Sequence, residues 1–176
     1  MLQNMTQTTP FEIRPEIPAD IPAIHALTAA AFLHAPHTSH TEQYIVDALR
    51  AAGELAVSLV AVQGNELVGH VALSAVTLSD GSTGWFGLGP LSVAPSHQRH
   101  GIGSRLVEHA LDALRARHAV GCVLLGDPFY YQRFGFKPDP ALVLPGVPAE
   151  HFQALALRGS VPAASVQYST AFEASA

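Results

Sequence analysis

The stretch from Gly89 to Gly103 constrains the fold more than any other part of the chain. It reads Gly-Pro-Leu-Ser-Val-Ala-Pro-Ser-His-Gln-Arg-His-Gly-Ile-Gly, an apolar strand end followed by a proline-containing turn and a glycine-rich loop. A helix opens directly from this loop, so several backbone N–H groups lack intrahelical partners there. The helix dipole adds partial positive charge at the same place. Together these features predict an anion site suited to phosphate, which Gly101 and Gly103 would allow to approach the backbone closely.

The sequence excludes two other phosphate-binding loops. No Gly-Lys-Ser/Thr follows, as a Walker loop requires, and the third glycine of the dinucleotide fingerprint is missing. The motif positions of this stretch are instead Leu91, Val93, Pro95, Gln98, Gly101 and Gly103. With these positions the stretch closely resembles the acyl-CoA pyrophosphate loop of the GNAT superfamily of N-acetyltransferases.

A second motif gives independent support for this resemblance. Tyr131-Gln-Arg-Phe-Gly135-Phe136 is similar to the second GNAT signature, Tyr-x-x-x-Gly-Phe, and follows the loop at the family's distance. The resemblance covers at least residues 85–136. The string from Gly126 to Phe136 and the two closing segments also resemble an uncharacterised bacterial branch of small acyltransferases.

Hydrophobic periodicity and turn signals predict the elements of one domain. We expect helices over 21–33, 41–52, 101–117 and 129–134, and strands over 11–14, 55–62, 66–78, 85–93, 120–125, 142–144, 151–157 and 165–172. The expected fold class is α/β (α+β): a mixed, mostly antiparallel sheet of about six to seven strands, with helices on both faces and one parallel βαβ crossover. Residues 1–10 are interpreted as a flexible leader and 11–173 as a single N-acetyltransferase domain.

Three local features refine this prediction. Asp20 is expected to cap the first helix, and Ser39 with Glu42 is expected to form a capping box on the second. Gly89-Pro90 interrupts a strand, because proline cannot donate to the ladder. In the GNAT fold, the strand before the phosphate loop carries a bulge and splays from its neighbour, and its freed backbone groups bind the pantetheine arm.

Composition limits the classes of partner that the protein is expected to bind and indicates its cellular compartment. The net charge of −5 argues against nucleic acid as a partner, and no apolar stretch reaches the length needed to span a membrane. The single cysteine, Cys122, lies in an apolar run, which predicts a buried thiol in the reducing cytoplasm. His34, His37 and His40 lack the ligand spacing of a structural zinc site, so no metal is expected. The sequence is also compatible with a homodimer.

The resemblance implies acetyl transfer from the co-substrate acetyl-CoA to a primary amine, by direct attack within a ternary complex. The acceptor is expected to be a small-molecule or peptide amine, and its identity is left open. Tyr131 is the expected general acid, since its reference pKa of roughly 10 lies near the roughly 8.5 of a thiol, and Tyr130 is the alternative. The implied cofactor-binding residues are Leu91, Ser92, Val93, Gln98, Arg99, His100, Gly101, Ile102, Gly103, Ser104 and Phe134.

The general base is not assigned by the sequence. Many family members use a carboxylate on the strand before the loop, but residues 85–93 contain no acid. Asp127, His70 and Ser92 are candidates, and a water relay or an already neutral amine would also serve. The missing acid keeps a second interpretation open, a CoA- or acyl-CoA-binding regulatory module with little or no turnover. A toxin that acetylates aminoacyl-tRNA is disfavoured by the acidic balance.

Overall fold

A computed structural model describes residues 10–176, so the predicted leader, apart from Pro10, lies outside the described residues. The helices are α1 (Ile21–Phe32), α2 (Glu42–Ala51), α3 (Ile102–Ala116) and α4 (Pro128–Tyr131). The strands are β1 (Glu12–Pro15), β2 (Leu55–Gln63), β3 (Glu66–Ala75), β4 (Thr77–Leu78), β5 (Trp85–Val93), β6 (Gly121–Leu125), β7 (Leu142–Val143), β8 (Phe152–Ala156) and β9 (Ala164–Gln167). Within residues 10–176, no helix has both the length and the apolar character needed to cross a bilayer.

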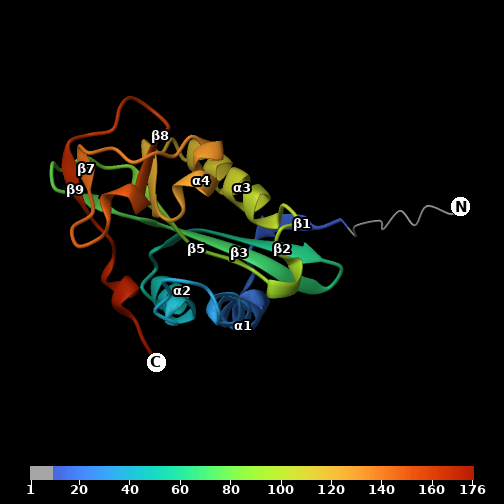
Figure 1. Cartoon of the computed structure of the whole chain (residues 1–176). Coiled ribbons are helices and arrows are strands. Elements are labelled where there is room, and N and C mark those ends of the chain that lie inside the picture. The colour runs from blue at the N-terminus through green and yellow to red at the C-terminus, as the bar shows by residue number, and fades with distance from the viewer. Residues whose placement is uncertain (1–9) are drawn as a thin grey trace, which may run out of the picture.

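The main sheet has six strands in the order β1-β2-β3-β5-β6-β8. All neighbouring strands are antiparallel except β5 and β6, which are parallel and joined through α3. Helices α1 and α2 cover one face of this sheet, and α3 and α4 lie on the other (Figure 1). The predicted mixed sheet with one parallel crossover and helices on both faces is confirmed.

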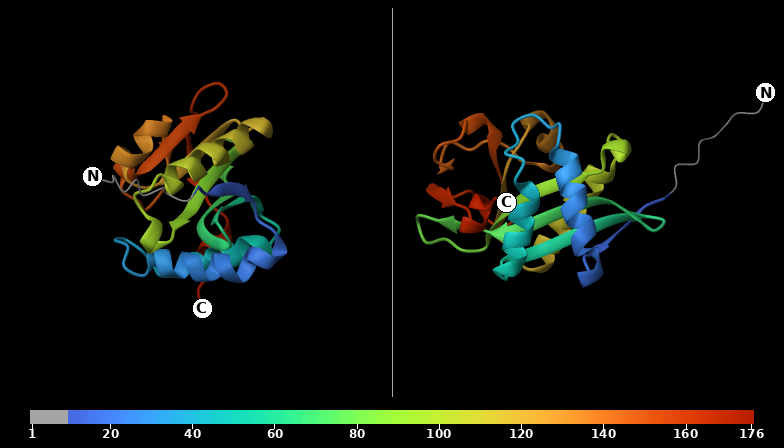
Figure 2. Two further views of the ribbon diagram at one scale, coloured as in Figure 1. Left: turned by 90° about the vertical axis from the view of Figure 1, so that its right-hand side faces the viewer. Right: turned by 90° about the horizontal axis from the view of Figure 1, so that it is seen from below.

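The hydrophobic core follows the predicted helix faces. The apolar stripe of α3, including Ile102, Leu106 and Leu114, is buried against the sheet, as expected for an amphipathic helix. On the opposite face, Ile24 of α1 and Val46 of α2 pack on Val60 of β2. The end-on view on the left of Figure 2 shows the same order of layers, with α1 and α2 below the sheet and α3 above it, and the view from below shows α1 and α2 lying across the sheet. The packing of α3 on the sheet therefore fixes the position of the loop before α3.

Strand β5 is irregular at Gly89-Pro90, as predicted. In its register with β3, Val71 pairs with Leu91 and Leu73 pairs with Leu88, so β5 carries one extra residue between these pairs. On its other edge, β5 pairs with β6 only over Trp85–Gly87. Beyond this point the two strands have no further ladder pairs, which leaves backbone groups of β5 available at the edge facing β6.

The carboxyl-terminal third differs from the sequence prediction. The strand expected over 66–78 divides at Val76, because β4 leaves the main sheet and pairs with β9. Strands β4, β9 and β7 form a separate three-stranded sheet. The strand expected over 165–172 is wrong in its second half, where residues 170–173 form a 3₁₀ turn. This turn packs on α2 rather than extending a sheet.

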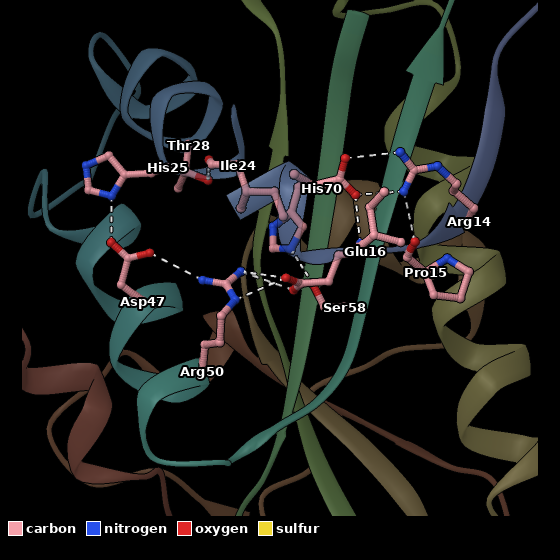
Figure 3. Close-up of polar contacts among 12 residues, drawn as sticks. Arg14, Pro15, Glu16, Ile24, His25, Thr28, Asp47, Arg50, Ser58 and His70 are labelled. Atoms are coloured by element: carbon pink, nitrogen blue, oxygen red, sulfur yellow. Dashed lines mark hydrogen bonds and ion pairs between the residues drawn. The ribbon is translucent and has the colours of Figure 1, made fainter. Parts of the chain in front are cut away.

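Two ion pairs connect β1 and the residue after it to the helical layer: Arg14 pairs with Asp20, and Glu16 pairs with Arg50 of α2 (Figure 3). Asp20 occupies the predicted N-cap position of α1, but its carboxylate makes no cap bond to the helix. It instead accepts hydrogen bonds from the Arg14 guanidinium at 2.7 and 3.1 Å and from the Ile17 N–H at 2.8 Å. The guanidinium offers a charge-assisted, bidentate contact that a neutral N–H cannot match, and it lowers the pKa of Asp20.

Candidate active site

The loop before α3 has the geometry of an anion site. Gly101 lies in the left-handed region with φ of 82° and precedes the first residue of α3. The first helical hydrogen bond runs from the Arg105 N–H to the Gly101 carbonyl at 3.1 Å. The N–H groups of residues 102–104 thus precede the helical ladder and are left for a ligand. Glycine provides no side chain that could cap them, and no side-chain cap bond is present.

A pocket of about 480 Å³ lies over these groups. Most of the residues predicted to bind the cofactor line it: Leu91, Val93, Gln98, Arg99, Gly101, Ile102, Gly103 and Ser104. Three additional lining residues are His97, Tyr130 and Arg133. Among these described lining residues there are two arginines and no acid, so the pocket suits a phosphate group. We call it the phosphate pocket.

Three predicted residues do not line the phosphate pocket. Ser92 is buried, because side chains alternate along a strand and its neighbours Leu91 and Val93 point toward the pocket. His100 is exposed in the loop. Phe134 packs against the Tyr130 ring, with ring centroids 5.7 Å apart.

Tyr130 belongs to the phosphate pocket. Its hydroxyl lies 3.2 Å from the Ser104 hydroxyl, and the Arg133 guanidinium stacks over its ring at 4.4 Å from the centroid. Arg133 also donates to the Tyr130 carbonyl at 2.8 Å. These contacts hold a cation beside the loop. Sequence reasoning missed Arg133, although its position three residues after Tyr130 on a helical turn was a usable signal.

Tyr131 faces a second pocket, of about 470 Å³. Its walls come from the irregular part of β5, the ends of α1 and α2, and the carboxyl-terminal segment; we call it the acceptor pocket. The lining residues are Phe32, Glu42, Ile45, Leu88, Gly89, Pro90, Leu91, Leu125, Tyr131, Tyr168 and Phe172. Leu91 lines both pockets, so they meet at β5.

The Tyr131 ring is firmly positioned. It contacts Tyr130 and Phe136 edge-on, with centroids 4.8 and 6.1 Å away. Burial raises the pKa of the Tyr131 hydroxyl well above its usual value, because the phenolate would lose water. The hydroxyl therefore keeps its proton at neutral pH. The structure separates the two adjacent tyrosines, Tyr131 toward the acceptor pocket and Tyr130 toward the phosphate pocket.

None of the three base candidates lines the acceptor pocket. His70 is fully buried, and burial lowers its pKa to about 4, so its ring is neutral. Ser92 is buried with no hydrogen-bond partner for its hydroxyl. Asp127 is exposed and caps α4 by accepting from the Phe129 N–H at 2.9 Å.

The acid in the acceptor pocket is Glu42, which the sequence predicts only as part of a capping box. The expected capping box is wrong, because the N-cap of α2 is Thr41 and not Ser39. Oε1 of Glu42 nevertheless accepts from the Ser39 N–H at 3.3 Å and from the Thr38 hydroxyl. The other carboxylate oxygen, Oε2, is buried without a partner. Only tertiary structure reveals this placement, since α2 and β5 lie far apart in the sequence.

The loop between α1 and α2 contains the three histidines His34, His37 and His40. Among residues 10–176, no three His, Cys, Asp or Glu side chains converge in a way that would bind a metal ion.

Known proteins are similar to this chain in sequence and in fold. The family model for the acetyltransferase (GNAT) family matches residues 21–136. The uncharacterized N-acetyltransferase YhbS of Escherichia coli (strain K12) is 37% identical over 126 residues, which are 71% of this chain and 72% of YhbS. A GNAT family acetyltransferase from Brucella melitensis, solved in complex with acetyl-CoA, superposes with a TM-score of 0.83 at 43% identity, covering 93% of this chain and 99% of that one. The structure of E. coli YhbS in complex with CoA gives a TM-score of 0.84 at 33% identity, covering 93% and 92%.

The matched family region contains the phosphate loop, α3 and the Tyr131 segment. Sequence, fold and site geometry therefore agree, and the chain belongs to the GNAT family of acetyltransferases.

Proposed function

We propose that this protein transfers an acetyl group from acetyl-CoA to a primary amine within a ternary complex. The observation that carries the proposal is the junction at Leu91, where the phosphate pocket and the acceptor pocket meet on the irregular part of β5. A molecule with a phosphate at one end and a thioester at the other can span this junction. An amine can then reach the thioester from the acceptor pocket.

The residues of the phosphate pocket fit the CoA pyrophosphate. A β-carbon built on Gly101 would meet no atom within 4 Å, so a ligand has open space beside that backbone. The N–H groups of residues 102–104 would donate to the phosphate oxygens. Arg99 and Arg133 supply positive charge from the pocket wall. The acyl-CoA supplies the electrophilic thioester carbonyl carbon.

The remaining chemistry is distributed between β5 and Tyr131. As the amine nitrogen bonds to the carbonyl carbon, negative charge develops on the oxygen, and the free backbone N–H groups around Leu91–Val93 would stabilise it. The carbon–sulfur bond then breaks, and the leaving thiolate takes the Tyr131 hydroxyl proton. Burial raises the pKa of Tyr131, so its hydroxyl is protonated at neutral pH but is a weaker acid than an exposed tyrosine.

Direct transfer is supported by the state of Cys122. This residue is the only cysteine in the chain, is fully buried, and has a pKa raised by burial. It cannot serve as an acyl carrier, because the thiolate is the nucleophile and it is inaccessible here. A single unpaired thiol also fits a cytoplasmic location. The homodimer stays a prediction.

The test compares two adjacent tyrosines. Tyr131→Phe should lower the rate of thiol release from acetyl-CoA about 100-fold and leave acetyl-CoA affinity nearly unchanged, because the ring faces the acceptor pocket. Tyr130→Phe is the matched control: it should weaken acetyl-CoA binding and keep turnover at saturation. An unchanged turnover in Tyr131→Phe would remove it from the acid role.

A regulatory module that binds CoA without turnover is the second candidate. The absence of an acid from the sequence of β5 favours it. Calorimetric binding of acetyl-CoA with no thiol release, across a panel of amines, would support this alternative and exclude the enzyme.

A further inference from the structure

Resting on the proposed acetyl transfer, we propose that Glu42 is the carboxylate that receives the acceptor: its Oε2 binds the acceptor's ammonium group and accepts its proton. The acceptor is a primary amine on an apolar or aromatic body without a carboxylate. This assigns the general base to α2 instead of the acid-free strand β5.

Glu42 has the environment of a ligand-binding carboxylate. Only 9% of the residue is exposed, yet it lines the acceptor pocket together with Tyr131. Its Oε1 is fixed by Thr38 and Ser39 in the loop before α2. Its Oε2 is buried with no hydrogen-bond partner. A buried acceptor atom without a donor is costly, and an ammonium N–H would supply that donor.

A second feature of Glu42 is its position at the amino-terminal end of α2. Glu42 is the first residue of α2, where the positive end of the helix dipole stabilises a negative charge. Two loop donors on Oε1 add to this effect. Glu42 is the one acidic side chain among the described lining residues of a pocket whose other walls are mostly apolar.

The pocket walls set the substrate class. Among the described lining residues none is Lys, Arg or His, and the remaining titratable groups are Tyr131 and Tyr168. An acceptor carboxylate or phosphate would thus be buried without a counter-charge, which is strongly unfavourable. Phe32, Leu125 and Phe172 offer apolar surface to the body of the amine. This combination selects arylalkylamines over amino acids.

The proton balance closes with these two residues. One ammonium proton passes to Glu42, which leaves a neutral amine. The nitrogen–carbon bond forms, and the nitrogen's surplus proton leaves to water. The carbon–sulfur bond breaks and the thiolate takes the Tyr131 proton. Exchange with water then returns the proton of Glu42 to Tyr131.

The first arm of the experiment tests substrate choice. Thiol release from acetyl-CoA is measured with 2-phenylethylamine and with L-phenylalanine, which differ only by the carboxylate. We expect transfer to 2-phenylethylamine at least about tenfold faster in kcat/KM. Equal rates would overturn the predicted acceptor class. Transfer by the wild type to no amine would overturn the acetyltransferase itself, together with this proposal.

The second arm tests Glu42 through pH. Glu42→Gln keeps the shape and should lower kcat/KM for 2-phenylethylamine about 100-fold at pH 7. This deficit should shrink toward higher pH, because the neutral amine fraction rises, and it should be small with 2,2,2-trifluoroethylamine, a weakly basic amine. The ratio to the wild type at each pH cancels titration of Tyr131, Tyr168, His40 and Glu173, which lie in the pocket wall or in segments next to α2.

Two controls make the result interpretable. Glu54→Gln changes an exposed carboxylate just beyond α2 and should retain wild-type rates. Glu42→Asp tests the position of the carboxylate, because the shorter side chain moves the carboxylate back from the pocket. Acetyl-CoA affinity and the thermal melting temperature report whether each variant is folded. A folded Glu42→Gln protein with unchanged kcat/KM, or with a deficit independent of pH and amine basicity, would overturn the role of Glu42.

Discussion

The Tyr131 ring lies directly against the backbone of Gly126, so that a β-carbon on Gly126 would come 2.5 Å from Cε2 of the ring. Gly126→Ala must therefore displace the ring. We expect kcat to fall at least about tenfold, because small misplacements of a reacting group are costly. The KM for acetyl-CoA should change little. Steady-state kinetics checks both values.

The same contact predicts non-additivity. In a Tyr131→Phe background the hydroxyl is already absent, so Gly126→Ala should cause little further loss of kcat. If the two losses multiply instead, Gly126 acts through something other than Tyr131.

Gly101 allows a test of the phosphate pocket at constant backbone conformation. Its φ of 82° is unfavourable for most residues, but Asp and Asn both tolerate the left-handed region. Gly101→Asp places a negative charge beside the pyrophosphate site and should abolish acetyl-CoA binding by calorimetry. Gly101→Asn, of the same shape without the charge, should bind at least about tenfold more tightly than Gly101→Asp. Equal affinities in the two variants would contradict the loop assignment.

The sequence was sufficient to predict the layers and the loop, because both depend on local patterns. The stripe of α3 and the Gly89-Pro90 interruption are visible in residues close together along the chain. Glu42 and Tyr168 could not be assigned in this way. They reach the acceptor pocket only because α2 and the carboxyl-terminal segment pack beside β5. Asp20 failed as a cap because a guanidinium from β1, six residues earlier, competes for its oxygens.

A tight contact in the core gives a stability prediction. A β-carbon on Gly121 of β6 would come 2.4 Å from the Trp85 ring, and Trp85 is 1% exposed. Gly121→Ala should lower the free energy of unfolding by about 1–3 kcal/mol through overpacking. Urea denaturation measures this loss. In a Trp85→Phe background the smaller ring leaves room, so Gly121→Ala should cost less there; an unchanged cost would place the strain elsewhere.

The buried His70 predicts how stability depends on pH. Its Nε2 lies 2.8 Å from the Ser58 hydroxyl (Figure 3), its Nδ1 has no partner, and burial lowers its pKa from 6.5 to about 4. Between these two values the unfolded chain binds a proton that the folded protein does not. Stability from His70 is therefore complete above about pH 6.5 and is lost as pH falls toward 4, by about 3 kcal/mol in total.

His70→Gln removes this titration and keeps a donor for Ser58. Urea denaturation at pH 7 and pH 4 should show that the variant loses about 3 kcal/mol less than the wild type on acidification. His34→Gln, a change at an exposed histidine, should retain the full acid sensitivity of the wild type. The wild type and His70→Gln both contain the Arg14–Asp20 pair, whose lowered carboxylate pKa also costs stability in acid. The difference between these two proteins therefore isolates the contribution of His70. Parallel losses in the wild type and His70→Gln would show that the ring is not kept neutral by burial.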